Sequence, residues 1–305
     1  MPLFSIQNHK LERIKKIDFK LEKDIQKLSE ENLKEIFGLE FFRTEFQLNN
    51  LRIDTLAFDK ESNSFVIIEY KKGSSFSVID QGYAYLALLL NNKADFILEY
   101  NERMDKNLRK NDVDWSQSRV MFIAPDFTNY QRKSIEFKDL AFELWEVNKY
   151  NNETILFNQI KSPETSESIT TISKSNKVVQ KVSNEVKVIR EEDHFKNRNP
   201  EIVELYYKVR SRILEMDSNI EIKPYVVFIA FKMDKNIVDV TLQKTQMKIW
   251  LNLSLNELED SRNMAKDVSK VGHWGHGDYE ITLKPEDDLN YIMTLIEQSY
   301  QENYV

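Results

Sequence analysis

Residues 51–71 have the sequence LRIDTLAFDKESNSFVIIEYK, and this stretch decides the fold of the N-terminal half. Two runs rich in branched and aromatic residues flank the short polar segment KESNS, a pattern typical of a β-hairpin. Each run nevertheless contains a carboxylate, Asp54 in the first and Glu69 in the second. Because an isolated buried carboxylate is costly, each must be hydrogen-bonded, paired, protonated or bound to a metal.

Glu69 and Lys71 lie two residues apart, so they project from the same face of their strand, and the hairpin would bring Asp54 beside them. Two carboxylates with open positions suit Mg²⁺ or Mn²⁺. A nearby lysine would stabilise charge or orient an attacking water during phosphodiester hydrolysis. The alternative is an ordinary cross-strand ion pair with Asp54 capping a turn, and spacing alone does not separate the two interpretations.

The surrounding pattern predicts a mixed sheet flanked by helices. Apolar residues at helical spacing predict a helix over 21–37 that ends at Gly38, and a nearly all-apolar run predicts a buried helix over 78–90. Further strands are expected at FFRTEFQL (41–48), FILEYN (96–101), RVMFIAP (119–125), FELWEVNKY (142–150) and ETILFNQI (153–160), the last two joined by Asn-Asn.

The hairpin, together with the following helix containing DQGYAYLALL, resembles the PD-(D/E)XK nuclease superfamily, which includes restriction endonucleases and repair nucleases. The resemblance covers roughly residues 21–160. It implies that Asp54, Glu69 and the carbonyl of Tyr70 bind the metal, that Lys71 assists the water, and that Gln81 faces the site. Tyr85, one helical turn beyond Gln81, would share its face.

The resemblance has one departure and one open position. The residue before Asp54 is Ile53 where the superfamily pattern has proline. An acid from the first helix often joins such sites, and Glu31, Glu35 and Glu45 all remain candidates, each with an ordinary solvated carboxylate as the alternative.

Residues 161–198 are polar and repetitive and predict a linker, within which VVQKVSNEVKVI (178–189) could form a short strand or helix. Residues 199–305 predict a second, smaller α+β domain. Asn199-Pro200 opens a helix to about 216, and Pro285 starts a final helix. Strands are expected at PYVVFIAFK (224–232), NIVDVTLQK (236–244), QMKIWLNL (246–253) and DYEITL (278–283).

This second domain resembles a domain of unknown function found in proteins labelled predicted transport proteins, and its partner cannot be inferred from the residues. Its segment GHWGHG contains His273 and His276 three residues apart. The spacing places no third metal ligand, so a glycine-rich turn with backbone demands is the simpler interpretation. The other interpretation is a binding surface formed by the histidine and tryptophan side chains of this turn.

Composition limits the remaining function classes. The 305 residues include no cysteine, which excludes disulfides and thiolate metal sites. No apolar segment suits a signal peptide or membrane helix, so no membrane partner and a cytoplasmic protein are expected. A net charge of −7 argues against a bulk DNA-coating protein. Lys10, Arg13, Lys15 and Lys16 could meet a phosphate backbone, although the solvated face of an N-terminal helix is the simpler expectation.

The sequence therefore predicts an α/β (α+β) protein: a restriction-endonuclease-like mixed sheet flanked by helices over 1–160, a linker, and a smaller α+β domain. The expected function is a Mg²⁺- or Mn²⁺-dependent nuclease that hydrolyses phosphodiester bonds of nucleic acid, with DNA as the expected substrate, in repair or defence. The alternative is a catalytically inactive nucleic-acid- or protein-binding module that retains the nuclease fold. A homodimer remains open.

Overall fold

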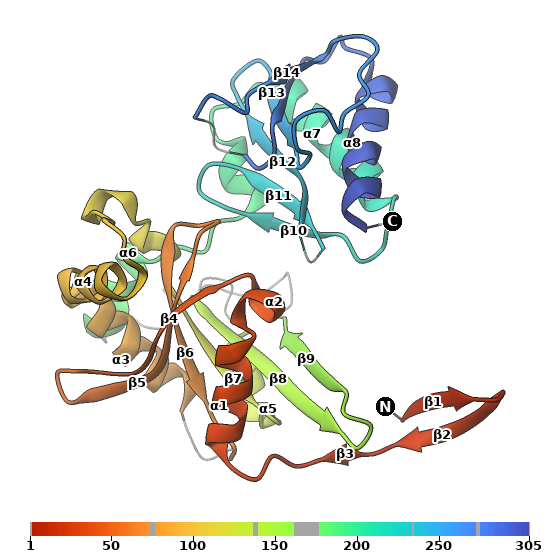
Figure 1. Cartoon of the computed structure of the whole chain (residues 1–305). Coiled ribbons are helices and arrows are strands. Elements are labelled where there is room, and N and C mark those ends of the chain that lie inside the picture. The colour runs from red at the N-terminus through yellow and green to blue at the C-terminus, as the bar shows by residue number, and fades with distance from the viewer. Residues whose placement is uncertain are drawn as a thin grey trace. The chain divides into compact units, whose positions relative to one another are not determined.

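The computed structural model describes residues 2–73, 77–136, 140–161, 177–233, 235–272 and 275–304. The chain divides into two compact units, Met1–Val188 and Ile189–Val305. Figure 1 shows the elements of both units in chain order. Each unit has its own sheet and its own buried core, and each is described by itself.

The N-terminal unit is built on a mixed seven-stranded sheet of order β3-β8-β7-β6-β5-β4, with β9 also paired to β8. Strand β5 pairs antiparallel with both β4 and β6, whereas β6, β7 and β8 run parallel. The strands are β3 (Lys16–Ile17), β4 (Glu40–Leu48), β5 (Leu51–Asp59), β6 (Ser64–Tyr70), β7 (Arg119–Ala124), β8 (Phe142–Tyr150) and β9 (Ile155–Ile160). The expected hairpin is confirmed, since Phe58 pairs with Phe65 and Thr55 with Ile68.

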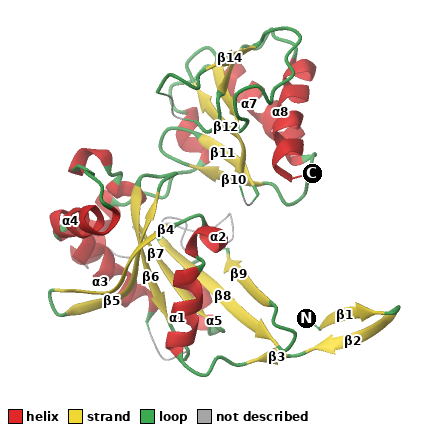
Figure 2. Ribbon diagram, viewed as in Figure 1, coloured by secondary structure: helices red, strands yellow, loops and turns green. Residues whose placement is uncertain are grey.

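Helices cover both faces of this sheet (Figure 2), as the sequence predicts. Helices α1 (Glu22–Glu31) and α2 (Leu33–Phe37) cover one face, and α3 (Val78–Asn91), α4 (Lys93–Met104) and α6 (Lys177–Glu185) cover the other. The short α5 (Asn129–Ser134) contacts α3. Central strand β6 is apolar on both sides: Phe65 and Ile67 pack toward α3, while Val66 and Ile68 pack toward α1. Burial on both faces is typical of strands in the parallel part of a sheet.

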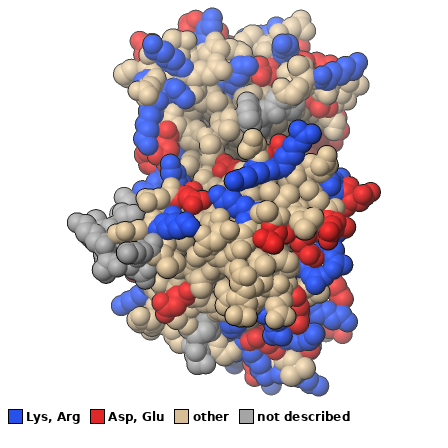
Figure 3. Space-filling model, turned by 90° about the vertical axis from the view of Figure 1, so that its left-hand side faces the viewer, with Lys and Arg blue, Asp and Glu red and all other residues tan. Residues whose placement is uncertain are grey.

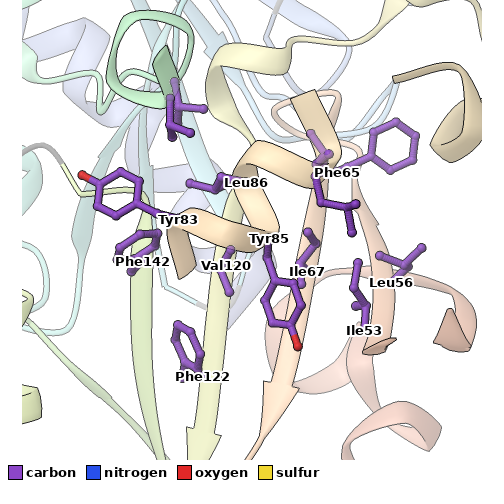
Figure 4. Packing of buried hydrophobic residues seen from close by; sticks show 14 of the residues in the cluster. Ile53, Leu56, Phe65, Ile67, Tyr83, Tyr85, Leu86, Val120, Phe122 and Phe142 are labelled. Atoms are coloured by element: carbon purple, nitrogen blue, oxygen red, sulfur yellow. The ribbon is translucent and has the colours of Figure 1, made fainter. Parts of the chain in front are cut away.

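Helix α3 lies unusually close to the sheet at Gly82. A Cβ at this position would lie 2.6 Å from the ring of Phe142 on β8. Figure 4 shows Tyr83 beside Phe142 on this packing surface, with Leu86 and Tyr85 further along the same helix. Only glycine permits this approach, which fixes the height of the first turns of α3 above the strands.

Three expected elements of the N-terminal unit differ from the structure. The predicted strand FILEYN is part of α4, where Phe96 and Tyr100, four residues apart, share one buried helical face. The predicted 21–37 helix breaks at Asn32 into α1 and α2, and it ends at Gly38 as expected, with a φ of 68°. The N-terminal helix expected around Lys10–Lys16 is wrong: a hairpin of β1 (Leu3–Gln7) and β2 (Lys10–Ile14) occupies that region.

The C-terminal unit is an antiparallel sheet of order β10-β11-β12-β13-β15-β14, with helices α7 and α8 packed on one face. The elements are α7 (Pro200–Leu214), β10 (Glu221–Pro224), β11 (Ile229–Lys232), β12 (Asn236–Leu242), β13 (Met247–Leu251), β14 (Ala265–Asp267), β15 (Tyr279–Leu283) and α8 (Leu289–Tyr304). The strand expected over 224–232 is divided by a turn in which Tyr225 N donates to Phe228 O at 2.8 Å. The final helix begins at Leu289, and the short β14 was not expected.

The region expected as a linker contains ordered structure within the described residues. Of the two alternatives for 178–189, the helix is observed as α6, and Val179, Val182 and Val186 join the buried cluster that includes α3. Residues 162–176 of that region, and His273 and Trp274 of the second domain, lie outside the described residues. Across the described ranges, no helix combines the length and apolarity needed to cross a membrane.

Candidate functional site

Strands β5 and β6 bring the three ionisable residues of the hairpin motif together. Asp54 and Glu69 each lie one position beyond the paired residues Thr55 and Ile68 on their strands. Lys71 Nζ donates to Glu69 Oε1 at 2.6 Å, and Tyr70 N donates to Asp54 Oδ2 at 3.0 Å. The backbone of Lys71 continues the sheet, because its N–H donates to Ile123 O at 2.9 Å. The site therefore rests on hydrogen-bonded strand rather than on a loop.

Helix α3 supplies the polar neighbours of Glu69. Gln81 Nε2 donates to Glu69 Oε1 and to the Tyr85 hydroxyl, both at 3.1 Å. Tyr85 in turn donates to Arg52 O at 3.2 Å, and Figure 4 shows its ring projecting from α3 toward the strands near Ile53. Gln81 and Tyr85 thus share one helical face over the strand ends, as their spacing predicts.

The second oxygen of Glu69 is the unusual atom of this site. Glu69 is 4% exposed, and its Oε2 is buried with no hydrogen-bond partner among the described residues. Buried carboxylate oxygens almost always have partners, because leaving one without any costs free energy. A buried carboxylate oxygen without a hydrogen-bond donor is one that a bound cation can satisfy.

Asp54 has a perturbed acidity. Burial, followed by the negative charge of Glu69, raises the pKa of Asp54 to about 6, while the Tyr70 N–H and the charge of Lys71 oppose that rise. Burial and the same Glu69 charge also raise the pKa of the Tyr85 hydroxyl. The negative charge of Glu69 therefore disfavours ionisation of Asp54, and Lys71 offsets this effect only in part.

The three candidate acids do not contact this cluster. Glu31 pairs with Lys27 at 3.9 Å, Glu45 lies 3.7 Å from Lys23 and 3.6 Å from Arg52, and Glu35 is exposed on α2. None of the three has a hydrogen bond or ion pair to Asp54, Glu69 or Lys71 among the described residues.

A different part of α1 approaches the site. Glu22, Gln26 and Glu30, four residues apart, form one polar stripe on the helix, here called the α1 stripe. Glu22 Oε2 accepts from Lys72 N at 2.8 Å, and its charge adds to the raised pKa of Asp54. Gln26, which is buried, donates to Asp54 O and to Glu30 Oε1, both at 3.0 Å. Helical spacing could have revealed the stripe, but not the strand ends that it meets.

The cluster offers two carboxylates to a hard divalent cation, which is fewer ligands than a site built from protein side chains alone would need. The described residues contain no cluster of three or more histidine, cysteine or acidic side chains arranged to hold a metal. Mg²⁺, however, usually takes one or two protein carboxylates and retains water or substrate oxygens. Glu69 Oε2, together with Asp54, whose other oxygen accepts no hydrogen bond from the described residues, meets that requirement. The carbonyl of Tyr70 belongs to the residue that directly follows Glu69 on β6.

The C-terminal unit contains a second polar cluster, in which both carboxylate oxygens of Asp239 accept hydrogen bonds. Asp239 is fully buried, and its Oδ2 accepts from His276 N at 2.7 Å and contacts His276 Nδ1 at 2.6 Å. Asn236 Nδ2 donates to Asp239 Oδ1 at 2.9 Å. The turn that presents His276 requires glycine, because Gly277 has a φ of 84° and a Cβ there would lie 1.8 Å from Leu251 O.

The surface charge is mixed. On the face shown in Figure 3, lysine and arginine side chains of the described residues are interspersed with aspartate and glutamate. This agrees with an acidic chain that has 43 basic and 50 acidic residues, so any attraction of an anionic partner must be local.

Comparison with known proteins gives relatives for both parts of the chain. Among solved structures, a repair endonuclease from Pyrococcus abyssi is 18% identical with a TM-score of 0.24, covering 39% of this chain and 44% of that one. An EndoMS–dsDNA complex is 17% identical with a TM-score of 0.26, covering 43% and 47%. This chain thus spans less than half the length of each of these structures.

The sequence relatives are closer. Residues 191–303 match the model of a domain of unknown function, DUF5655. An uncharacterized protein of Haemophilus influenzae is 47% identical over 302 residues, covering 99% of this chain and 100% of that protein. The chain therefore belongs to the same protein family as this Haemophilus influenzae protein.

Proposed function

We propose that the N-terminal unit is a metal-dependent nuclease that hydrolyses phosphodiester bonds of nucleic acid, with DNA as the expected substrate. The observation that carries the proposal is the buried Oε2 of Glu69, which has no hydrogen-bond partner among the described residues, together with the raised pKa of the neighbouring Asp54. The low TM-scores of the endonuclease structures add nothing to this argument.

Each residue has a role that follows from its contacts. Asp54 and Glu69 would hold Mg²⁺ or Mn²⁺ together with the Tyr70 carbonyl, and Gln81 orients Glu69 through its 3.1 Å hydrogen bond. The bound ion would supply Lewis-acid activation and neutralise charge on the phosphate. Lys71 brings an ammonium group beside Glu69, where it can orient a water or stabilise negative charge on phosphate oxygens.

One contact favours the alternative of a non-catalytic binding module. Lys71 and Glu69 already form a close ion pair, with side chains only 19% and 5% exposed, and such a pair can be purely structural. The two proposals differ in whether a divalent ion binds.

The test uses the full chain with Mn²⁺, and with single- and double-stranded DNA and RNA. Glu69→Gln and Asp54→Ala are compared with wild type and with Glu45→Gln, a matched control that removes a nearby carboxylate outside the cluster. We expect Mn²⁺ to raise the melting temperature of the wild type and of the control only. Cleavage should fall at least about 100-fold in both site variants.

Two outcomes would decide against the nuclease. Cleavage that persists unchanged in Asp54→Ala would show that another site, or a contaminant, is responsible. An absence of Mn²⁺ binding combined with measurable nucleic-acid affinity would establish the binding module instead.

A further inference from the structure

The N-terminal arm, residues 2–20, is mostly exposed, and Phe19 is its one buried residue. Its hairpin, β1 and β2, has no buried residue, and Figure 1 shows it extending away from the sheet. Phe4, Ile6 and Leu11 are 42%, 75% and 64% exposed. An isolated two-stranded hairpin is only marginally stable in water, so a surface of this kind is expected to be covered by a partner.

Three of the exposed apolar side chains, Phe4, Ile6 and Leu11, share one face of the hairpin. Phe4 pairs with Arg13 and Ile6 with Leu11, and paired residues of antiparallel strands project to the same side. The tip is a tight turn in which Asn8 and His9 have φ angles of 48° and 63°, the conformation of a two-residue hairpin loop with the natural strand twist. The arm therefore presents a defined ribbon in which Arg13 shares the apolar face, whereas Lys10, paired with Gln7, lies on the opposite face.

Charge identifies the class of partner. The first 20 residues contain five lysines and arginines against two acids, a net charge of +3, whereas the remainder of this −7 chain has a net charge of −10. Among the described residues, no acid pairs with the side chain of Lys10 or Arg13. This separation favours a polyanion and disfavours a second copy of the same cationic arm.

The base of the arm lies at the candidate site. Strand β3 pairs with Lys149 and Tyr150 of β8, beyond the residues of β8 that pair with β7. Lys16 Nζ donates to Pro125 O at 3.1 Å just after β7, and Lys72 Nζ donates to Lys20 O at 2.5 Å just after β6. The arm thus leaves the sheet at the ends of the parallel strands β6, β7 and β8, the same end at which Glu69 and Lys71 lie.

We propose that the N-terminal arm is a β-ribbon that binds double-helical DNA and holds it at the candidate site. A two-stranded ribbon fits a major groove about 12 Å wide, with cations on the phosphates and apolar side chains against sugars or thymine methyl groups. The proposal rests on the proposed nuclease for its location, but DNA binding by the arm does not require catalysis.

Binding is measured by fluorescence anisotropy of a labelled 20-base-pair (about two-turn) duplex, without metal, across a range of salt concentrations. The variant Lys10→Glu/Arg13→Glu is compared with Lys106→Glu/Lys110→Glu, which makes the same charge change at exposed positions of the same unit. We expect the arm variant to bind about 10- to 100-fold more weakly, and its slope of log affinity against log salt to fall by about two, because roughly one counterion is released per phosphate contact. The control should change neither by that amount.

A second variant, Ile6→Ser/Leu11→Ser, tests the apolar face without changing charge, and it should weaken duplex binding several-fold. Equal affinity of the arm and control variants would overturn the proposal. So would a loss of self-association in Ile6→Ser/Leu11→Ser, seen by sedimentation, with unchanged DNA affinity, because the arm would then contact a second copy. Arm-dependent DNA binding without Asp54-dependent cleavage would support the arm proposal and reject the nuclease. Asp54-dependent cleavage with DNA binding that does not depend on the arm would support the nuclease and reject the arm proposal.

Discussion

Glu69 of the N-terminal unit and Asp239 of the C-terminal unit are both carboxylates inside apolar strands, FVIIEY and IVDVTL, yet their surroundings differ. Glu69 is 4% exposed and Asp239 is 0% exposed, so both have lost nearly all their water. Asp239 accepts hydrogen bonds on both oxygens from Asn236 and His276, whereas the described part of the chain supplies Glu69 with donors on one oxygen only.

The comparison shows two ways in which a protein can accommodate a buried carboxylate in a strand. One is a complete set of protein donors, which makes the acid a structural element. The other leaves an oxygen available and keeps the surrounding strands rigid, which suits a ligand.

The largest effect is expected for Lys71→Met, which removes the ammonium group beside Glu69 and keeps a similar side-chain length. Cleavage should fall by about 10²–10³, because a positioned charge donor is lost. Mn²⁺ should still bind, since Glu69 Oε1 is released from its 2.6 Å ion pair. Calorimetric titration with Mn²⁺ and a single-turnover cleavage assay measure the two quantities, and a parallel loss of both would mean that Lys71 acts only through folding.

Asp239→Ala should lower the stability of the C-terminal unit and leave cleavage unchanged. It leaves the Asn236 amide and the His276 N–H without their buried acceptor, so local stability of the C-terminal sheet should fall by about 3 kcal/mol. Hydrogen exchange at the amides of β12 and β13 reports this change, with the amides of β6 as internal control. Cleavage by the N-terminal unit should be unchanged, and a matching loss of activity would contradict the separation of roles.

Asp54→Asn should stabilise the metal-free protein. The pKa of Asp54 is raised from 3.8 to about 6 by folding, so ionisation opposes folding at neutral pH. The gain at pH 7.5 should be about 1–2 kcal/mol after allowance for solvent screening of this partly exposed group, and it should vanish below the unfolded pKa of 3.8. Urea unfolding at pH 7.5 and at pH 3.5 measures the difference, which would be absent at both pH values if Asp54 were unperturbed.

Mn²⁺ affinity should depend on pH through the same group. Because the metal requires the ionised carboxylate, the affinity should fall up to about tenfold for each pH unit below about 6 and level off above it. Titrations from pH 5 to pH 8 measure this profile. A profile with no change between pH 5 and pH 7 would remove Asp54 from the metal ligands.

The sequence predicts the β5–β6 hairpin and the contact between Gln81 and Tyr85 because both depend on local features: a short polar turn and a helical repeat. Tertiary context decides where the prediction is wrong. The FILEYN segment has strand-like composition, but Phe96 and Tyr100 pack as a helical face against the sheet. The N-terminal hairpin depends on two left-handed residues, Asn8 and His9, that a charge pattern does not reveal.

Helical spacing places Glu22 on the α1 stripe, but its role depends on where α1 meets the end of β6, which the sequence does not indicate. Its backbone contact to Lys72 joins residues 50 positions apart. Glu31, Glu35 and Glu45 are equally acidic and close in sequence, so residue type does not distinguish them from Glu22. Only the packing direction of the helix does.

Because of the α1 stripe, the site depends on the helical register of α1 as well as on its residue types. Glu22 reaches the backbone of Lys72 after β6, and Gln26 reaches the backbone of Asp54 on β5. An α-helix turns about 100° per residue, so inserting one residue between Glu22 and Gln26 would rotate one contact away from the other without removing either side chain. The length of a single helical turn thus sets the alignment of the two strands that carry the carboxylates.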